Sequence, residues 1–476
     1  MRGRRAPVLA VASVLVAPTL NGAQPVASTP SVQVFTLDGA IQYAAEHYPL
    51  VRAALEQVNA SEAGVSVARA AYLPRLDSLW QSSRATVNNV FGQVLPQPVL
   101  PAISGPVLPS ASSQSVWGSA AGALFSWQPF DFGLRKAAVE GAEAFVRRAR
   151  ASEALTRLDV QGAAGAAFLS VLAAERAVLA ARADLDRRDV LARTAQTLVD
   201  NQLRPGAEGS RADAERAAAR TRFILAEQNV MLARTALARV LGTATGSVTI
   251  DAAHLLDSLP PEEVPAPAPT EHPFVAARRA AVDAAHAQRD VLARTDLPRV
   301  FVQSSVFARG SGANPDGRLD GSLDGLGLDR ANWSAGVQVF FPNLFDFPSL
   351  RAREAAAAAS ERAESALYDE AVLTIARQKE GAAAMVSATR AVAANTPIQL
   401  AAAELSEAQA RARYQAGLAN VVEVADAQSL LAQAEFLDQL ARVEVWRALL
   451  GAAVASGDLA PFLALLPSSS GASGAK

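Results

Sequence analysis

The amino-acid sequence predicts a mainly α-helical chain with four β-strands, built from two duplicated halves. Three observations carry this prediction: long proline-free stretches rich in alanine, arginine and glutamate, short segments in which apolar and polar residues alternate, and an internal repeat that relates the two halves. Aromatic residues make up only 6% of the 476 residues, a composition that favours long helices over several compact globular domains.

The first 23 residues have the pattern of a secretory signal, because three arginines precede an apolar core at 6–20 and small residues follow at 22–23. That core is too short to span a bilayer as a helix, and we expect no later apolar run of the required length. The chain has no cysteine, so it has neither a disulfide framework nor a thiolate metal site. Its formal net charge of -2 gives no reason to expect nucleic-acid binding.

An internal repeat begins with a Glu-His pair and a nearby proline in each half. Pro49 aligns with Pro273 and Pro74 with Pro298, so both pairs are 224 residues apart (273 − 49 and 298 − 74). The constant spacing from the first proline to the second in each half indicates duplication. Each half is therefore predicted to contain, in order, a helix, a strand, a loop, a strand, a long helix, a turn and a helix.

The strands are predicted from alternation. In the segment 332–342, Trp333, Val337 and Val339 fall on one face, with small and polar residues such as Asn332 and Gln338 on the other. Similar but less regular alternation gives the other segments, so we expect strands at about 75–91, 116–128, 299–309 and 331–341. These lengths are close to the 9 to 11 residues with which a β-strand crosses a membrane.

The helices are expected to be unusually long. No proline occurs from 132 to about 200, and leucines recur there at the three- and four-residue spacing of a coiled-coil seam. At 1.5 Å per residue, such a helix is roughly 100 Å long. Pro397 is expected to break or kink the corresponding helix of the second half.

The expected organisation follows from the repeat and from the proline-rich segment between its copies. It comprises a signal peptide at 1–23, a first repeat at 35–257 with long helices at about 132–242, a Pro-rich linker at 258–270, a second repeat at 271–455 with long helices at about 349–455, and a flexible tail at 456–476.

Four membrane strands cannot form a closed barrel alone, because an open sheet leaves unpaired backbone groups in hydrocarbon at a cost of several kcal/mol each. The chain must therefore assemble with copies of itself, and two copies give 8 strands while three give 12. Only the larger barrel leaves an obvious aqueous lumen. Pro74 and Pro298, each within Leu-Pro-Arg, then mark the breaks where a helix becomes a membrane strand.

Five features occur together in a recognisable order: FTLDGAIQYAAEHYPLVRAAL at 35–55, the two Leu-Pro-Arg tripeptides, WQPFDFGLRKA at 127–137, FPNLFDFPSLRAR at 341–353 and RYQAGLANVVEVADAQ at 413–428. Through them the chain resembles the TolC-type outer membrane efflux proteins. The resemblance implies a homotrimer in which a 12-stranded β-barrel in the outer membrane stands on a long α-helical coiled-coil barrel in the periplasm. It also implies a periplasmic adaptor (membrane fusion) protein and an inner-membrane RND or ABC transporter as partners, in efflux or type I secretion.

One departure concerns the start of each half. Where the family typically has Asn-Pro, this chain has Tyr48-Pro49 and His272-Pro273, which removes the expectation of an asparagine helix cap.

Matched residue by residue, the family's periplasmic aperture falls on Tyr414, Gly417, Glu423, Asp426 and Asp213. Glu423 and Asp426 are three residues apart and share a helix face, so three-fold symmetry would make each a ring of acids. From the residues alone an ordinary solvated helix face is the favoured interpretation; the resemblance favours the aperture. Ala419 stands where some members carry a basic residue that ties the aperture shut.

The turns beside the aperture are small and glycine-bearing, which suits packing against an adaptor. The expected adaptor contacts are Arg204, Pro205, Gly206, Gly417 and Leu418. A simpler interpretation is that Gly206 and Gly417 are helix C-caps. The capping role and the adaptor contact are compatible with each other.

No pattern in the sequence predicts a catalytic, metal or cofactor site. The four histidines lack metal-ligand spacing, and the Asp-Gly repeats at 315–329 fit no calcium motif. A periplasmic coiled-coil scaffold or adaptor would explain the helices but not the alternating segments, and an exported enzyme has no candidate site. We therefore predict an outer-membrane channel that passively conducts substrates delivered by an inner-membrane transporter, with a cargo that the sequence does not name.

Overall fold

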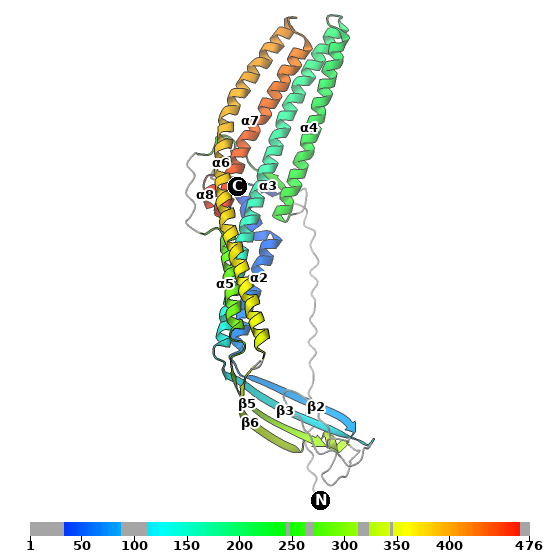
Figure 1. The fold of residues 1–476 in the computed structure, drawn as a ribbon. Helices are drawn as coiled ribbons and strands as arrows, with labels where there is room; N and C mark the ends of the chain where they lie inside the picture. Colours follow the sequence, from blue (N-terminus) through cyan, green and yellow to red (C-terminus); the bar gives the residue numbers. More distant parts are fainter. Residues whose placement is uncertain are drawn as a thin grey trace, which may run out of the picture.

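The computed structural model describes residues 33–86, 113–243, 248–252, 254–261, 271–312, 323–342 and 346–466. The molecule is long and narrow, with a β-sheet at one end and two helical hairpins at the other (Figure 1). The expected signal at 1–23, the strand end at 87–91, most of the 258–270 linker and of the 315–329 loop, and residues 467–476 of the expected tail lie outside the described residues. The described part of that tail, 456–466, contains a short helix at Ala460–Leu463 in which Phe462 is buried.

The first half supplies eight of the described elements. They are β1 (Gln33–Phe35), α1 (Leu37–His47), α2 (Pro49–Ala70), β2 (Arg75–Thr86), β3 (Ser115–Phe130), α3 (Leu134–Asp200), α4 (Gly206–Leu241) and β4 (Val248–Ile250). The second half supplies α5 (Pro273–Leu292), β5 (Arg299–Ser311), a 3-10 turn η1 (Leu323–Leu326), β6 (Arg330–Phe340), α6 (Phe347–Gln415), α7 (Val421–Ser456) and α8 (Ala460–Leu463).

The duplication is visible in the lengths of equivalent elements. Helices α3 and α6 have 67 and 69 residues, and α4 and α7 have 36 each. In both halves a Leu-Pro-Arg tripeptide connects a helix to a strand, so β2 begins directly after Pro74 and β5 directly after Pro298. Proline disfavours helical conformation in the residue before it, which accounts for the helix ending upstream of each tripeptide.

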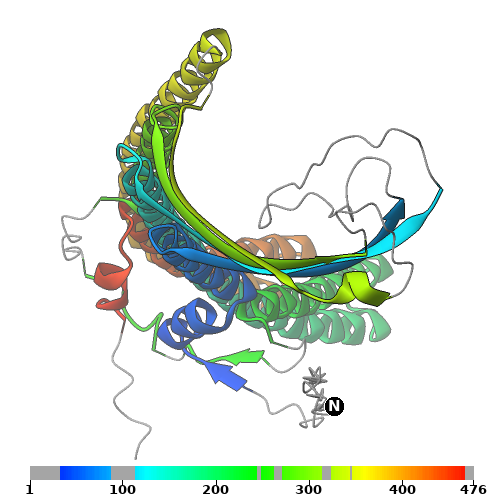
Figure 2. The same cartoon turned by 90° about the horizontal axis from the view of Figure 1, so that it is seen from below.

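The four long strands form one antiparallel, curved sheet in the order β2-β3-β5-β6 (Figure 2). The register places apolar side chains of all four strands on one face: Leu76, Trp80, Phe125, Trp127, Val302, Val306, Trp333, Val337 and Val339. The opposite face carries Asp77, Gln81, Ser126, Gln303, Ser305, Ser334 and Gln338, among others. The apolar face is open, since Trp80 is 72% and Trp333 79% exposed.

The Asp-Phe-Gly sequence fixes the change from β3 to α3. The Asp131 carboxylate accepts hydrogen bonds from the backbone N–H of Gly133 (3.1 Å) and of Arg135 (3.1 Å), so it satisfies donors at the helix start. Phe132 and Gly133 have positive φ angles of 52° and 90°, which turn the chain out of the sheet. The sharp turn thus needs both the acid and the glycine.

Helix α6 runs without interruption through Pro397, so a break there is wrong, while a kink stays a prediction. Proline costs the helix one backbone hydrogen bond, but packing against α7 compensates. The neighbouring Thr396 is buried and donates its hydroxyl to Asp438 of α7 (2.9 Å), and Ala393 is also buried.

The main core, called the central core, lies where α3 and α7 cross α1 and the small parallel sheet of β1 and β4. Its largest buried side chains include Ile41, Phe168, Leu169, Trp446 and Phe462. Gly162 and Gly165 permit this packing, because a Cβ at either position would lie within 3 Å of Val454 or Leu450. The β1–β4 pair was not predicted, since strands of three residues leave no periodic signal.

Among the described residues, one helix, α3, contains an 18-residue window apolar enough to cross a membrane, with a mean hydropathy of 1.5. The expectation that no such run follows the N-terminal segment was therefore wrong. Core helices of soluble proteins pass the same test, and α3 packs against α1, α2, α4, α5 and α7.

The caps at the two proline-led helices differ. Tyr48 provides no side-chain cap to α2, whereas the His272 Nδ1 accepts a hydrogen bond from the backbone N–H of Phe274 at 3.1 Å. A histidine thus takes the capping role at the start of the second half.

Candidate functional site

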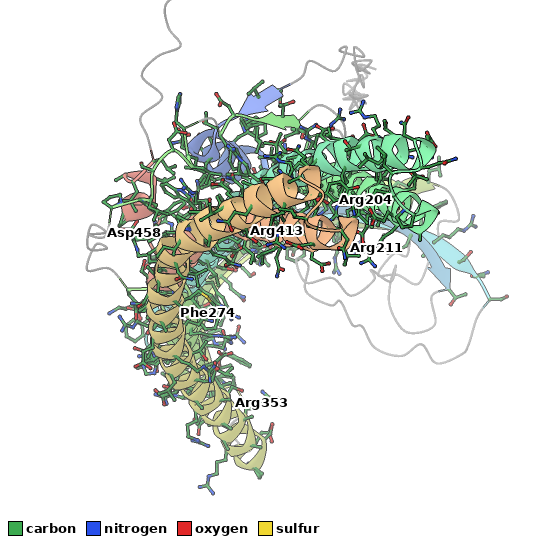
Figure 3. All side chains as sticks on the ribbon, turned by 90° about the horizontal axis from the view of Figure 1, so that it is seen from above. Arg204, Arg211, Phe274, Arg353, Arg413 and Asp458 are labelled. Atoms are coloured by element: carbon green, nitrogen blue, oxygen red, sulfur yellow. The ribbon has the colours of Figure 1, made fainter. Side chains whose placement is uncertain are left out.

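The candidate site lies at the far end of the two hairpins, where the α3–α4 turn and the α6–α7 turn lie side by side. Seen from above, Arg413 lies on the second-half hairpin and Arg204 at the first-half hairpin beside it (Figure 3). All of the predicted aperture and adaptor-contact residues belong to these turns and to the helix ends beside them.

The two turns are built differently. After α6, Gly417 has a φ of 76° and the Leu418 N–H bonds to the Arg413 carbonyl (2.9 Å), a glycine C-cap as expected. Gly206 is instead the first residue of α4, and Gln202 (φ 59°) takes the left-handed conformation in that turn. The C-cap interpretation of Gly206 was therefore wrong, because helix α4 starts at this glycine.

The predicted Tyr414 is the centre of a small core, called the tip core, in which it is only 3% exposed. The tip core consists mostly of alanine and valine: Leu191, Ala192, Ala195, Ala212, Ala410, Tyr414, Ala419, Val421, Val424 and Ala427. Small side chains allow four helix ends to approach one another closely. They also bury little apolar area, and hence contribute less stability per residue than large ones.

Arg204 links the two turns. Its guanidinium lies 5.3 Å from the centre of the Tyr414 ring, a cation–π distance, and its Nη2 donates to the Ala419 carbonyl at 3.0 Å. Glu208 lies 3.7 Å from the same guanidinium. Ala419 has no basic side chain, but an arginine from the other hairpin reaches its backbone.

The surroundings of Tyr414 keep its phenol neutral. Burial raises the pKa of Tyr414, the negative Glu208 raises it further, and Arg204 acts in the opposite direction. Within the described chain, the buried Tyr414 Oη, Glu407 Oε1 and Gln428 Oε1 have no hydrogen-bond partner. These three residues line a cavity of about 320 Å³ between α3, α6 and α7. Water or another chain must satisfy these atoms.

The predicted acids have different environments. Glu423 is paired with Arg413 (Nε to Oε1, 3.0 Å), and Asp213 with Arg216 (Nη2 to Oδ1, 3.1 Å). Asp426 is exposed on the same face of α7 as Glu423. A ring of acids would require further copies of the chain and stays a prediction.

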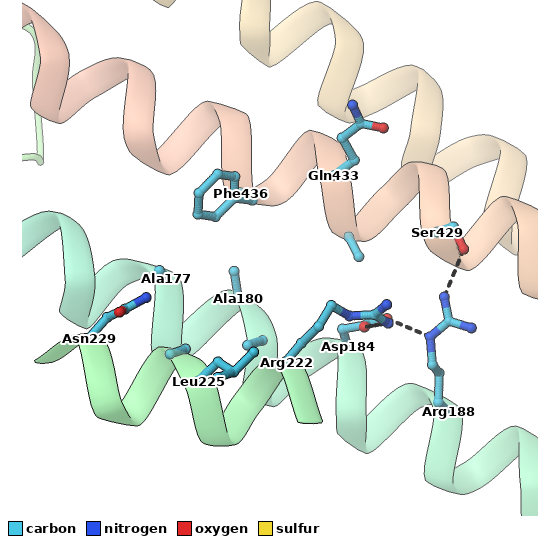
Figure 4. A pocket seen from close by; sticks show the side chains of 13 residues that line it. Ala177, Ala180, Asp184, Arg188, Arg222, Leu225, Asn229, Ser429, Gln433 and Phe436 are labelled. Atoms are coloured by element: carbon cyan, nitrogen blue, oxygen red, sulfur yellow. Dashed lines mark hydrogen bonds and ion pairs between the residues drawn. The ribbon is translucent and has the colours of Figure 1, made fainter. Parts of the chain in front are cut away.

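An ionic cluster around the buried Arg188, which was not predicted, lies further from the turns (Figure 4). Arg188 of α3 is 1% exposed and donates to Asp184 of its own helix (3.0 Å), Glu215 of α4 (2.9 Å) and Ser429 of α7 (2.8 Å). Arg222 of α4 bonds to the same Asp184 at 2.8 Å. A cavity of about 430 Å³ lies beside the cluster.

A sequence signal for this cluster did exist. Arg188 lies three residues from both Leu185 and Leu191, so it occupies the apolar register of α3. A charge in such a register indicates a buried ion pair, because an unpaired charge there would be too costly. Arg187 beside it forms a second pair, bidentate to Glu435 of α7 at 2.9 and 2.6 Å.

The sequence profile of the family described as outer membrane efflux protein matches residues 40–243 and 266–450. No curated protein matches the chain.

Solved structures with a similar fold include three outer-membrane proteins. The outer-membrane channel OprN has 20% identity and a TM-score of 0.69, covering 88% of this chain and 89% of that one. VceC from Vibrio cholerae has 18% identity and a TM-score of 0.69, covering 89% and 96%. The Campylobacter jejuni CmeC channel has 13% identity and a TM-score of 0.73, covering 88% and 85%.

Proposed function

Because this chain belongs to the outer membrane efflux protein family, we propose that it is the exit duct of a tripartite efflux or type I secretion system. The duct passively conducts substrates from an inner-membrane transporter to the exterior. The observation that carries the proposal is the two-faced sheet, with an open apolar face and a polar face extending over all four strands.

The sheet supports assembly into a trimer. Strands β2 and β6 lie at its two edges, each with one neighbouring strand in the described structure. In a membrane both edges must be paired, and the β6 edge of one copy can meet the β2 edge of the next. Three copies give 12 strands, with the apolar face toward lipid and the polar face toward an aqueous lumen. A periplasmic scaffold would leave this apolar face without a role.

The hairpin tips are the proposed periplasmic aperture. The link from Arg204 to Ala419 and Tyr414 holds the two hairpins of one chain together, and Asp426 is free to face a shared axis. Exposed apolar residues at the turns, with Leu418 at 71%, offer contacts to a periplasmic adaptor protein. The inner-membrane partner is then an RND or an ABC transporter.

Fractionation and conductance test this proposal. The full chain should be found in the outer-membrane fraction and should be extracted by mild detergent as a trimer. It should also form ion-conducting pores in planar bilayers. A water-soluble monomer from the periplasmic fraction would overturn it.

A further inference from the structure

The contacts between the two hairpins change along their length. At the level of Arg188, side chains of α3, α4 and α7 are joined by three arginines and three acids: Arg187, Arg188, Arg222, Asp184, Glu215 and Glu435. Their formal charges cancel, and each acid is within 3.0 Å of an arginine nitrogen. Of these, Arg188 and Asp184 are only 1% and 4% exposed, so displacing either would leave the other charge buried without this partner. The pair of Arg187 and Glu435 that joins α3 to α7 is partly exposed, at 21% and 24%.

On the tip side of this cluster the contacts are weaker. Helix α3 continues for twelve residues to Asp200, about 18 Å at 1.5 Å per residue. Over that length the hairpins meet through the alanine-rich tip core and through Arg204. The same region contains the buried polar atoms of Glu407, Tyr414 and Gln428 that have no partner in the described chain. Separating the hairpins there exposes little apolar area and lets these atoms meet water.

We propose that the ionic cluster around Arg188 is a fixed pivot, so that the hairpins of one chain separate only on its tip side. The proposal rests on the proposed function, in which the tips form the aperture. On the central side, α3 and α7 then move as one body with the central core. The position of the cluster in α3 sets the length of the segment that opens. The bidentate pair of Arg187 and Glu435 joins α3 to α7 beside the cluster.

Hydrogen–deuterium exchange of the full chain in detergent micelles tests the pivot. Backbone amides of 191–200 and 421–428 should exchange at least about tenfold faster than those of 165–180 and 437–450, because one charge-assisted hydrogen-bonded pair contributes roughly a factor of ten to a local opening equilibrium. In Glu435→Gln the fast region should extend toward 437–450. Arg188→Met should extend it further.

Arg193→Gln is the matched control. Arg193 pairs with Asp189 of its own helix, is mostly exposed, and lies near the same level, so its loss removes a charge without releasing a contact between helices. The control should leave the boundary in place. Uniform exchange along α3 and α7, or a boundary that stays put in both Glu435→Gln and Arg188→Met, would overturn the pivot.

Planar-bilayer conductance separates this proposal from the one it rests on. Conducting pores without an exchange boundary would reject the pivot and keep the channel. A boundary that moves with Glu435→Gln, in a chain that never conducts, would support the pivot as a mechanical feature and reject the channel.

Discussion

The central core and the tip core are formed largely by the same long helices, yet their side chains differ in size. The central core is filled by large residues such as Phe168, Leu169 and Trp446, and glycines bring α3 and α7 close together. The tip core is filled mainly by alanine and valine around Tyr414, next to buried polar atoms without partners in the described chain. The same long helices thus carry a core of large side chains in the middle of the molecule and a core of small ones at its end.

The largest expected effect compares one substitution in both cores. Leu169→Ala in the central core should destabilise the chain by about 4 kcal/mol, near the upper part of the range for buried leucines. Leu191→Ala in the tip core should cost about 2 kcal/mol, because the site borders a cavity and small neighbours. Denaturant unfolding followed by circular dichroism gives both values, and equal losses would remove the contrast between the cores.

A second comparison uses the glycines that end α7 and α6. Gly457 and Gly417 have φ angles of 84° and 76°, so alanine is strained at either position, by about 1–2 kcal/mol. A Cβ at Gly457 would also lie 2.8 Å from His272 and Pro273, whereas none of the described atoms lies within 4 Å at Gly417. Gly457→Ala should therefore cost about 3 kcal/mol, roughly twice the loss for Gly417→Ala. Thermal unfolding of the two variants decides it, and a greater loss at Gly417 would contradict the packing described at the central end.

A third prediction concerns acid sensitivity at the edge of the central core. The His272 Nε2 donates to the Val454 carbonyl at 3.0 Å and its Nδ1 accepts from Phe274, so only the neutral ring satisfies both bonds. Burial lowers the pKa of His272 from its ordinary value of 6.5. The unfolded chain therefore takes up this proton first, and stability should fall as pH drops below about 6.5.

The control for this prediction is His272→Asn, which keeps a capping acceptor and cannot titrate in this range. Melting temperatures measured between pH 7.5 and 5 should fall less steeply in the variant than in the natural chain. Parallel pH profiles would show that another group causes any acid sensitivity.

The smallest expected effect on stability is at the tip acids, where ion selectivity is the readout. Asp426→Ala should lower the cation preference of the pore more than Glu423→Ala, because Arg413 already neutralises Glu423. Both changes should alter stability by less than about 0.5 kcal/mol. Reversal potentials in a salt gradient test the order, most clearly at low ionic strength. An equal or larger change for Glu423→Ala would show that its pairing with Arg413 does not govern the field in the pore.

The sequence predicted the family and the combination of long helices with a strand-bearing end, and both are confirmed. Strand alternation and proline-free length are signals that depend on neighbours in the sequence, so they can be read without a structure. The prediction of a break at Pro397 was wrong, since α6 continues through it. The neighbouring Thr396 donates a hydrogen bond to Asp438, 42 residues later, a contact that no local sequence pattern shows.

The sequence located the candidate site but did not predict the contacts between its two turns. The motif around Tyr414 indicated the turn, whereas the reach of Arg204 across to Ala419 depends on how two distant hairpins are placed. The cluster of Arg188 with Glu215 and Ser429 likewise joins residues from three helices, and only its apolar register in α3 was visible beforehand. Long-range polar contacts leave no periodic trace in a sequence.

The short β1–β4 pair has a consequence for the order in which the chain can fold. Gln33 pairs with Val248 and Phe35 with Ile250, in parallel, and the Asp251 N–H bonds to the Phe35 carbonyl at 2.8 Å. Strand β1 can therefore pair only once residue 248 is available, and closing so long a loop costs more entropy than forming a local helix. Once this loop is closed, the strand near the end of the first half is paired with the strand at its start, before the second half has been synthesised. A nascent chain truncated after 261 should then protect its N-terminal strand from protease, and one truncated before 248 should not.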